Sequence, residues 1–478
     1  MTTHQVLKHS SNLSNRVQSF LLTSCLFFWL FEAPAQTRLP APTPAQLEWH
    51  ETEFYLFFHF GPNTFTNMEW GHGTETEDVF MPTNLDCDQW CRVAKQAGAK
   101  GIVITAKHHD GFCLWPSKYS KHTVRESKWR DGKGDVLREL SDACRRHGLK
   151  FGVYLSPWDR NHPQYGTPEY NDIYEKTLTE LLTQYGELFE IWWDGANGEG
   201  PNGKKQVYDF HRFERVAARL QPNAVVFSDI GPGCRWAGNE QGIINTETNW
   251  GTLDTAGFKR GEGAPHTDTL NRGNENGALW LPAECDVSIR PGWFYHAEED
   301  EKVKTPNQLL EIYLKSVGRG ANLILNVPPD RRGRIHPQDS VNLAVFGEKL
   351  RTTFGNNLAT KAIARTGNGE KTTLLTDGRT ETSVIAANKG HIKHFTLEWD
   401  APQTIKALWL QEDVTQGQRV RIFIVQVWEN EQWEAVIRST TIGYRKIILP
   451  PTPFKTSKIR ISIMQSKATP ILSEIRAY

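Results

Sequence analysis

Short apolar runs alternate with amphipathic stretches along the first two thirds of the chain. Apolar runs of about four to eight residues bounded by turn residues are typical of buried strands, whereas apolar positions three and four apart indicate one face of a helix. The expected strands are 55–61, 101–106, 149–155, 188–193, 224–228, 288–295 and 321–327. The expected helices are 88–97, 135–147, 170–185, 206–220, 306–317 and 340–353.

This alternation predicts a parallel sheet in which each strand is followed by a helix. About seven or eight strands over roughly 310 residues favour a (β/α)8, TIM-like barrel over an open Rossmann sheet. No GxGxxG follows the first strand, which argues further against a dinucleotide site. We expect the barrel to span residues 37–355.

A second pattern begins near residue 356. After a stretch rich in threonine, glycine and lysine, alternating strand-like segments follow at 395–399, 405–410, 419–428, 434–438 and 458–463. Such spacing predicts an all-β sandwich over 356–478. The order LTDGRTETS, FTLEWD, KIRISI resembles the discoidin-like, galactose-binding-type sandwiches. Modules of this kind bind sugar or brace the barrel, and we favour bracing because no aromatic platform is evident.

The first 36 residues have the pattern of a secretory signal peptide. Lys8 and Arg16 precede an apolar run at 20–31, and Ala33-Pro34-Ala35 supplies a small-x-small cleavage site. The run is shorter than the roughly 18 to 20 residues that span a bilayer, so we expect an exported, periplasmic or secreted protein without stable membrane insertion. Lipidation at Cys25 is the alternative, although that cysteine lies within the run.

Charge and cysteine content narrow the choice of partners. Lysine plus arginine equal aspartate plus glutamate at 55 each, so no overall charge draws the chain to nucleic acid. The remaining cysteines are scattered without a CxxC pair, and Cys87 and Cys91 are expected to be buried thiols on one helix face. We predict no metal site and no cofactor.

Polar residues cluster where the predicted strands end, which is where barrel enzymes carry their chemistry. A single histidine there is more often a packed core residue, and Asp194 alone reads as a turn cap. Five such ends together indicate a site: His59, Lys107 to Asp110, Tyr154 to Asp159, Asp194, and Arg290 to His296.

Neutral donors and acceptors beside tryptophan rings suit a hydroxylated ring, that is, a sugar. Retaining glycoside hydrolysis uses two carboxyl groups, one a nucleophile and one an acid. Asp194 is the natural nucleophile, while Glu240, Glu247 and Glu284 are the candidates for the acid.

Six ordered motifs resemble those of glycoside hydrolase family 29, the α-L-fucosidases. They are HFGPNTF at 59–65, MEWG at 68–71, KHHDGF at 107–112, YLSPWDR at 154–160, IWWDGANG at 191–198 and IRPGWFYH at 289–296. The resemblance implies a retaining exo-fucosidase with Asp194 as nucleophile. It also implies sugar contacts from His59, Glu69, Trp70, His108, His109, Tyr154, Trp158, Arg290 and Trp293.

The acid/base differs between branches of that family. The stretch RWAGNE at 235–240 resembles the branch acting on α-1,3- and α-1,4-linked fucose of Lewis-type glycans, which implies Glu240 as acid/base. The alternative for Glu240 is a loop carboxylate paired with Arg235. Glu284 and Asp286 are the next candidates for the acid/base, and they are also candidates for contacts with the neighbouring galactose. The implied partner is a fucosylated glycan, and the competing functions are a broad-specificity fucosidase and a non-catalytic fucose-binding lectin.

Overall fold

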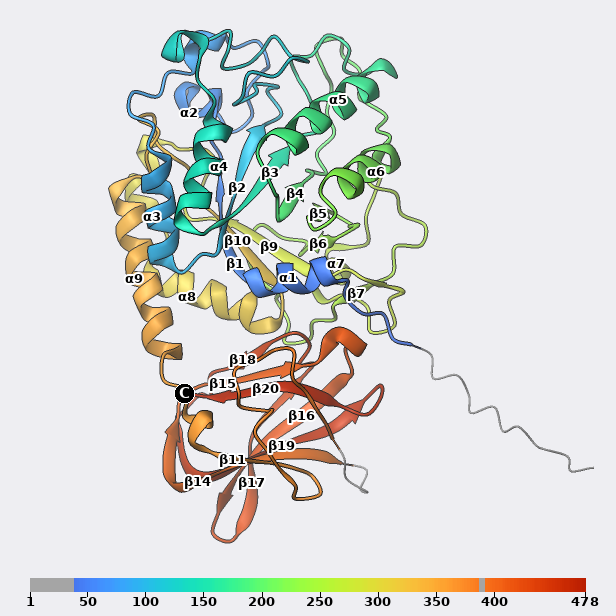
Figure 1. The fold of residues 1–478 in the computed structure, drawn as a ribbon, viewed down its shortest axis with the longest axis vertical. Coiled ribbons are helices and arrows are strands. Elements are labelled where there is room, and N and C mark those ends of the chain that lie inside the picture. The colour runs from blue at the N-terminus through green and yellow to red at the C-terminus, as the bar shows by residue number, and fades with distance from the viewer. Residues whose placement is uncertain (1–37, 387–391) are drawn as a thin grey trace, which may run out of the picture. The chain divides into compact units, whose positions relative to one another are not determined.

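The computed structural model describes residues 38–386 and 392–478, in which eight strands close into a parallel barrel (Figure 1). The order around the barrel is β1-β10-β9-β6-β5-β4-β3-β2, and each neighbouring pair is parallel. The prediction of a (β/α)8-like barrel is therefore confirmed. The strands are β1 (Phe54–Phe58), β2 (Gly101–Lys107), β3 (Lys150–Leu155), β4 (Glu190–Trp192), β5 (Val225–Ser228), β6 (Cys234–Trp236), β9 (Ala283–Ser288) and β10 (Asn322–Asn326).

Helices surround this barrel and begin and end on recognisable signals. The side chain of Asp135 accepts a hydrogen bond from the Arg138 amide at the start of α4, and Gly148 ends it with a φ of 63°. The helices are α1 (Pro44–Thr52), α2 (Pro62–Thr66), α3 (Cys87–Ala97), α4 (Val136–His147), α5 (Glu169–Gln184), α6 (Phe210–Leu220), α7 (Thr267–Arg272), α8 (Pro306–Lys315) and α9 (Pro337–Phe354). The buried apolar residues of α3, α4, α5, α6, α8 and α9 pack with those of the strands in one core.

Two barrel strands differ from the prediction. The expected strand at 288–295 is wrong: β9 ends at Ser288, and the segment after it bends at Pro291 and Gly292. Strand β6 was not expected at all. Neither strand has the apolar run that predicts a buried strand. In β9, polar Glu284 and Asp286 alternate with apolar neighbours, and β6 is only three residues long.

The C-terminal part consists of antiparallel sheets packed on a core that includes Leu397, Phe423 and Ile461. One sheet has the order β12 (Lys371–Thr372), β11 (Ile363–Thr366), β14 (Lys393–Ile405), β19 (Phe454–Ser466), β16 (Val420–Glu429), β17 (Gln432–Thr440). The other has the order β13 (Val384–Ile385), β20 (Ile471–Ala477), β15 (Leu408–Glu412), β18 (Lys446–Ile448). A two-stranded sheet, β7 (Thr252–Leu253) with β8 (Leu279–Trp280), stands apart from both.

A buried ion pair joins the sandwich to the base of the barrel. Arg445 Nη2 lies 2.6 Å from Glu53 Oε1, and its guanidinium stacks on the ring of Trp409, 4.1 Å from the ring centroid. The ring of His50 on α1 stacks on Tyr444 with centroids 4.3 Å apart. These contacts attach the sandwich to the barrel.

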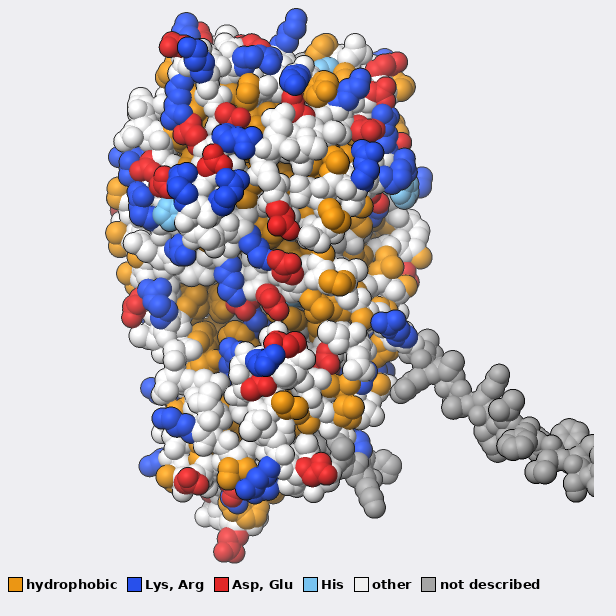
Figure 2. All heavy atoms as spheres, viewed as in Figure 1, with side chains coloured by type: hydrophobic (Ala, Val, Ile, Leu, Met, Phe, Trp, Pro, Cys, Tyr) orange, Lys and Arg blue, Asp and Glu red, His pale blue; other side chains and the backbone are white. Residues whose placement is uncertain are grey.

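The expected signal segment at 1–36 lies outside the described residues. Among the residues that are described, no helix has the length and apolar character needed to cross a bilayer. Cys87 and Cys91 are buried on α3 as expected, and both thiols are free. On the face drawn in Figure 2, lysine and arginine side chains are interspersed with aspartate and glutamate.

Candidate active site

A small cavity of about 170 Å³ lies where the barrel strands end. Sites for drug-sized ligands typically occupy about 300–1,000 Å³, so this volume suits a single small ring. The cavity is lined by Phe57, His59, Glu69, Trp70, His108, His109, Tyr154, Trp192, Asp194, Ala196, Glu240, Asp286 and Trp293. Most of the predicted site residues therefore meet in one place, although they come from segments far apart in the sequence.

Asp194 lies two residues after the end of β4, and its carboxylate is held from two sides. Tyr154 donates its hydroxyl proton to Asp194 Oδ2 over 3.0 Å, and the Ala196 amide donates to Oδ1 over 2.7 Å. His109 Nε2 lies 3.7 Å from Oδ2. The side chain is 27% exposed, so a carboxylate oxygen remains accessible from the cavity. This arrangement fixes the orientation of a potential nucleophile before a ligand binds.

The histidines of the cavity are neutral at pH 7. Burial lowers the pKa of His59 and of His109 to about 4, and it lowers the pKa of His108 well below its ordinary value. The Asn326 amide donates to Ser288 Oγ and to the Trp293 carbonyl, so its oxygen must accept from His59 Nδ1, 2.8 Å away. His59 Nε2 then carries a lone pair and can accept a hydrogen bond from a hydroxyl group.

Glu69 ties one loop of the cavity to another. Its carboxylate accepts from the Trp293 amide over 2.8 Å and lies 2.6 Å from His296 Nε2. The bond to the amide places the indole of Trp293 5.1 Å from the ring of His59. Trp70, which is 54% exposed, stands at the rim with its ring edge-on to His109. Glu69 thus acts on the cavity at least partly by holding Trp293.

Glu240 and Asp286 both line the cavity. Glu240 is exposed on the loop after β6, whereas Asp286 on β9 is only 4% exposed and accepts from Trp236 Nε1 over 2.8 Å. Burial, and next the negative charge of Glu240, raise the pKa of Asp286 well above its ordinary value. A buried carboxyl group that holds its proton more tightly than an ordinary aspartate therefore lines the same cavity as Glu240.

Arg235 is not the partner of Glu240. Its buried guanidinium donates to the backbone carbonyls of Leu270, Leu281 and Trp250 and to the Asn249 side chain. The alternative of an Arg235–Glu240 pair is therefore wrong.

Four further sequence candidates lie outside the lining of the cavity. Glu247 accepts from Ser439 of the sandwich, and Glu284 is fully buried inside the barrel. Arg290 is buried between Asp339 and Asp300 and does not line the cavity. Trp158 packs behind His109 with ring centroids 4.8 Å apart and donates to the Glu199 carbonyl.

Several residues of the site were not foreseen. Phe57 and Trp192 line the cavity two positions before His59 and Asp194, and the alternation of side chains along a strand could have identified them. The carboxyl of Asp229, after β5, lies so close to Gly195 that a Cβ atom there would meet Oδ2 at 2.4 Å. Burial, and next the charge of Asp194, raise the pKa of Asp229 to about 6.

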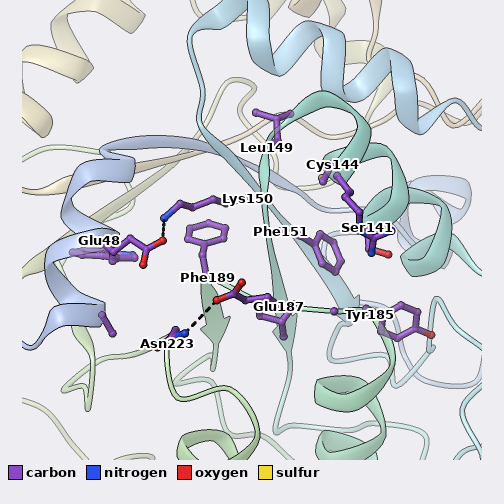
Figure 3. Close-up of a pocket in the computed structure, with 15 residues that line it drawn as sticks. Glu48, Ser141, Cys144, Leu149, Lys150, Phe151, Tyr185, Glu187, Phe189 and Asn223 are labelled. Carbon is purple, nitrogen blue, oxygen red and sulfur yellow. Dashed lines mark hydrogen bonds and ion pairs between the residues drawn. The ribbon is translucent and has the colours of Figure 1, made fainter.

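A larger cavity of about 420 Å³ lies at the opposite ends of β3 and β4 (Figure 3). Phe151 and Phe189 line it, Lys150 Nζ pairs with Glu48 over 2.7 Å, and Asn223 donates to Glu187. In barrels of this type the catalytic groups sit at the carboxyl ends of the strands, so this cavity is on the face associated with stability.

A (β/α)8 barrel whose strand ends surround a ring-sized cavity with carboxyl groups, neutral histidines and tryptophans has the features of a glycoside hydrolase. The sequence model of the family described as alpha-L-fucosidase matches residues 42–353. The chain belongs to this family, glycoside hydrolase family 29.

Individual relatives agree with this assignment. The chain is 39% identical over 451 residues to "Alpha-L-fucosidase 1" of Arabidopsis thaliana, covering 92% of this chain and 88% of that protein. The crystal structure of a glycoside hydrolase 29 family member from an unknown rumen bacterium is 41% identical, with a TM-score of 0.80 over 92% of this chain and 77% of that one. The Ruminococcus gnavus GH29 fucosidase in complex with fucose is 28% identical, with a TM-score of 0.82 over 92% and 95% of the two chains.

Proposed function

We propose that the protein is a retaining exo-α-L-fucosidase that releases terminal fucose, α-1,3- or α-1,4-linked, from branched Lewis-type glycans. The observation that carries this proposal is the position of Asp194 in a cavity sized for one ring, with Tyr154 and the Ala196 amide aiming its carboxylate. An exo-acting enzyme needs a cavity that admits one terminal sugar and no more.

In the proposed first step, an Asp194 carboxylate oxygen attacks the anomeric carbon, and the bond from that carbon to the leaving oxygen breaks while Glu240 protonates that oxygen. In the second step, Glu240 takes a proton from water, whose oxygen replaces Asp194 at the anomeric carbon. Two inversions leave the configuration unchanged.

The neutral histidines support binding of the sugar rather than proton transfer. Their lowered pKa values leave lone pairs and N–H groups that can each bond a hydroxyl. Trp192 and Trp293 line the cavity with apolar ring atoms, which suit the C–H side of a sugar.

The acid/base assignment rests on the place of Glu240 in the cavity wall and on its exposure. An acid/base must reach both the leaving oxygen and bulk water, and an exposed loop carboxylate does so more readily than Asp286, which is buried. The linkage preference rests on the RWAGNE stretch that carries Glu240.

A panel of substrates tests this function. Lewis a, Lewis x, 2′-fucosyllactose and 4-nitrophenyl α-L-fucoside are incubated with the protein and free fucose is quantified. Release from the two Lewis trisaccharides well above release from 2′-fucosyllactose supports the proposal. Comparable release from all four supports a broad-specificity fucosidase instead, and binding of the trisaccharides without any release would support a lectin.

A further inference from the structure

Two carboxyl groups lie inside the barrel, beneath the cavity. Glu190 on β4 and Glu284 on β9 are both fully buried. Glu284 accepts hydrogen bonds from the hydroxyl of Tyr55 and, over 2.7 Å, from Trp192 Nε1. Glu190 Oε1 accepts from Trp49 Nε1 over 3.2 Å. The catalytic steps described above use neither carboxyl group, so the pair calls for another explanation.

The surroundings of this pair are neutral. The side chains that contact it from the neighbouring elements are Trp49 on α1, Tyr55 on β1, Trp192 on β4 itself and the Cys234 thiol on β6, 4.0 Å from Glu190 Oε1. None of these contacts is a cation. Two buried carboxylates without a countercharge would be strongly destabilising, so the pair must retain a proton. Burial raises the pKa of both groups, and the charge of Glu284 adds to the effect on Glu190.

A metal ion is the competing explanation. Glu190, Cys234 and Glu284 offer one ligand atom each within 4.8 Å of one another. However, both oxygens of Glu284 and Oε1 of Glu190 accept hydrogen bonds from N–H or O–H groups of Trp49, Tyr55 and Trp192, which leaves only Glu190 Oε2 without a donor among the described residues. Full burial also leaves the ion without an entry path. These donors therefore favour a proton shared by the two carboxyl groups over a bound cation.

The pair is connected to the nucleophile through two aromatic rings. Trp192, held by Glu284, stacks on Phe227 with centroids 3.9 Å apart and planes 9° apart. Trp192 also stacks on Tyr154, with centroids 5.4 Å and planes 27° apart, and the ring of Phe57 lies 5.5 Å away. Tyr154 in turn donates to Asp194 Oδ2. A shift of Trp192 would therefore disturb both the wall of the cavity and the donor that orients Asp194.

We propose that Glu190 and Glu284 share one proton and act as a positioning pair, which fixes Trp192 in the wall of the sugar pocket and, through Tyr154, orients Asp194. This inference rests on the proposed function, because it assigns Asp194 as the nucleophile. The two glutamates do not touch the substrate.

Two substitutions of Glu284 test the proposal. In Glu284→Gln the amide oxygen still accepts from Trp192 and the amide nitrogen replaces the shared proton, so kcat and KM on 4-nitrophenyl fucoside should stay within about threefold of wild type. Glu284→Met keeps the approximate volume but removes the acceptor. We expect kcat to fall about 10- to 100-fold, as for loss of a bond to a charged or polarised partner, with a smaller change in KM.

Glu180→Met is the matched control. Glu180 on α5 is also buried and accepts an indole N–H, from Trp115 over 3.1 Å, but it does not line the cavity. Glu180→Met should lower the melting temperature as Glu284→Met does, while kcat stays at the wild-type level. Should Glu284→Met fail to fold, Trp192→Phe breaks the same bond from the other side and should also lower kcat.

Three results would overturn the positioning pair. The first is a wild-type kcat in Glu284→Met, or in Trp192→Phe where that variant replaces it. The second is a decrease of kcat in Glu284→Gln as large as that in Glu284→Met, and the third is one equivalent of metal in the purified wild-type protein, measured by mass spectrometry. The wild-type protein is assayed in parallel. An inactive wild type refutes the proposed function, whereas an active wild type with an unaffected Glu284→Met refutes only the positioning pair.

Discussion

Replacing Asp286 with asparagine separates the roles of the two carboxyl groups at the mouth of the cavity. Asp286 is 4% exposed, accepts from Trp236 Nε1 over 2.8 Å and keeps its proton because it is buried beside the charge of Glu240. Asparagine has the shape of the protonated acid and still accepts from Trp236. We therefore expect kcat/KM of Asp286→Asn on Lewis a to remain within about threefold of wild type, or roughly 0.7 kcal/mol.

The matched substitution, Glu240→Gln, should behave differently. Loss of a general acid lowers the rate by about 10²- to 10⁴-fold, which corresponds to about 2.7–5.5 kcal/mol of activation free energy. The loss should be large on Lewis a, whose leaving group is poor, and small on 4-nitrophenyl fucoside, whose leaving group needs no proton. Rates on both substrates, measured for both variants, provide the assay. If Asp286→Asn shows the large, leaving-group-dependent loss and Glu240→Gln does not, the assignment is refuted.

The same substitution has a predictable effect on stability. The folded protein keeps a proton on Asp286 that the unfolded chain releases above its ordinary pKa of about 3.8, so this group lowers the stability as the pH rises toward its folded-state pKa. Asparagine does not titrate and removes this penalty. Asp286→Asn should therefore melt at the same or a higher temperature than wild type at pH 7. A clear decrease would mean that Asp286 is charged in the folded protein.

Three further substitutions probe other parts of the structure. Tyr154→Phe removes the donor to Asp194 and should reduce kcat/KM about 10- to 100-fold, because loss of a hydrogen bond to a carboxylate costs about 1.5–3 kcal/mol; an unchanged rate would show that the bond is dispensable. Burial lowers the pKa of His50 to about 3, so this side chain stays neutral in the folded protein. In the unfolded chain it takes up a proton below pH 6.5, and this difference lowers the free energy of unfolding by about 2 kcal/mol at pH 5. His50→Phe should thus be more stabilising in denaturant titrations at pH 5 than at pH 8, and equal effects would contradict the shift. Arg290→Met leaves Asp339 buried without a partner and should lower the free energy of unfolding by about 3–5 kcal/mol while KM is unchanged, whereas a raised KM would restore Arg290 as a substrate contact.

The sequence predicts the barrel well because most of its strands are apolar on both faces. Strand β2, with the sequence GIVITAK, is buried throughout and therefore stands out as an apolar run. Strand β9, AECDVS, is equally buried, but its inward positions carry carboxyl groups that the cavity and the interior pair require. The pattern fails at the strand where polar residues occupy the inside of the barrel.

The sequence predicts which polar residues follow the strands, but not how far each one lies from the rim of the cavity. Strand ends marked by His59, His109 and Asp194 are visible as polar residues after apolar runs. Whether a polar residue faces the cavity or lies below it depends on its position along the strand relative to the rim. Glu284 and Asp286 are two residues apart on the same face of β9, and only the second reaches the cavity. Arg290 lies beyond the end of that strand, and its contacts with Asp339 and Asp300 depend on tertiary packing.

The most direct test of the central claim is the identification of the residue that becomes covalently attached to the sugar. A 2-deoxy-2-fluoro fucosyl fluoride slows hydrolysis of the glycosyl-enzyme more than its formation, so the intermediate accumulates and can be digested and sequenced by mass spectrometry. The account predicts one fluorofucosyl group per protein, on Asp194 within the segment 187–197. Label on Glu240, Asp286 or Asp229 would contradict it, as would release of fucose with inverted configuration and no labelled peptide.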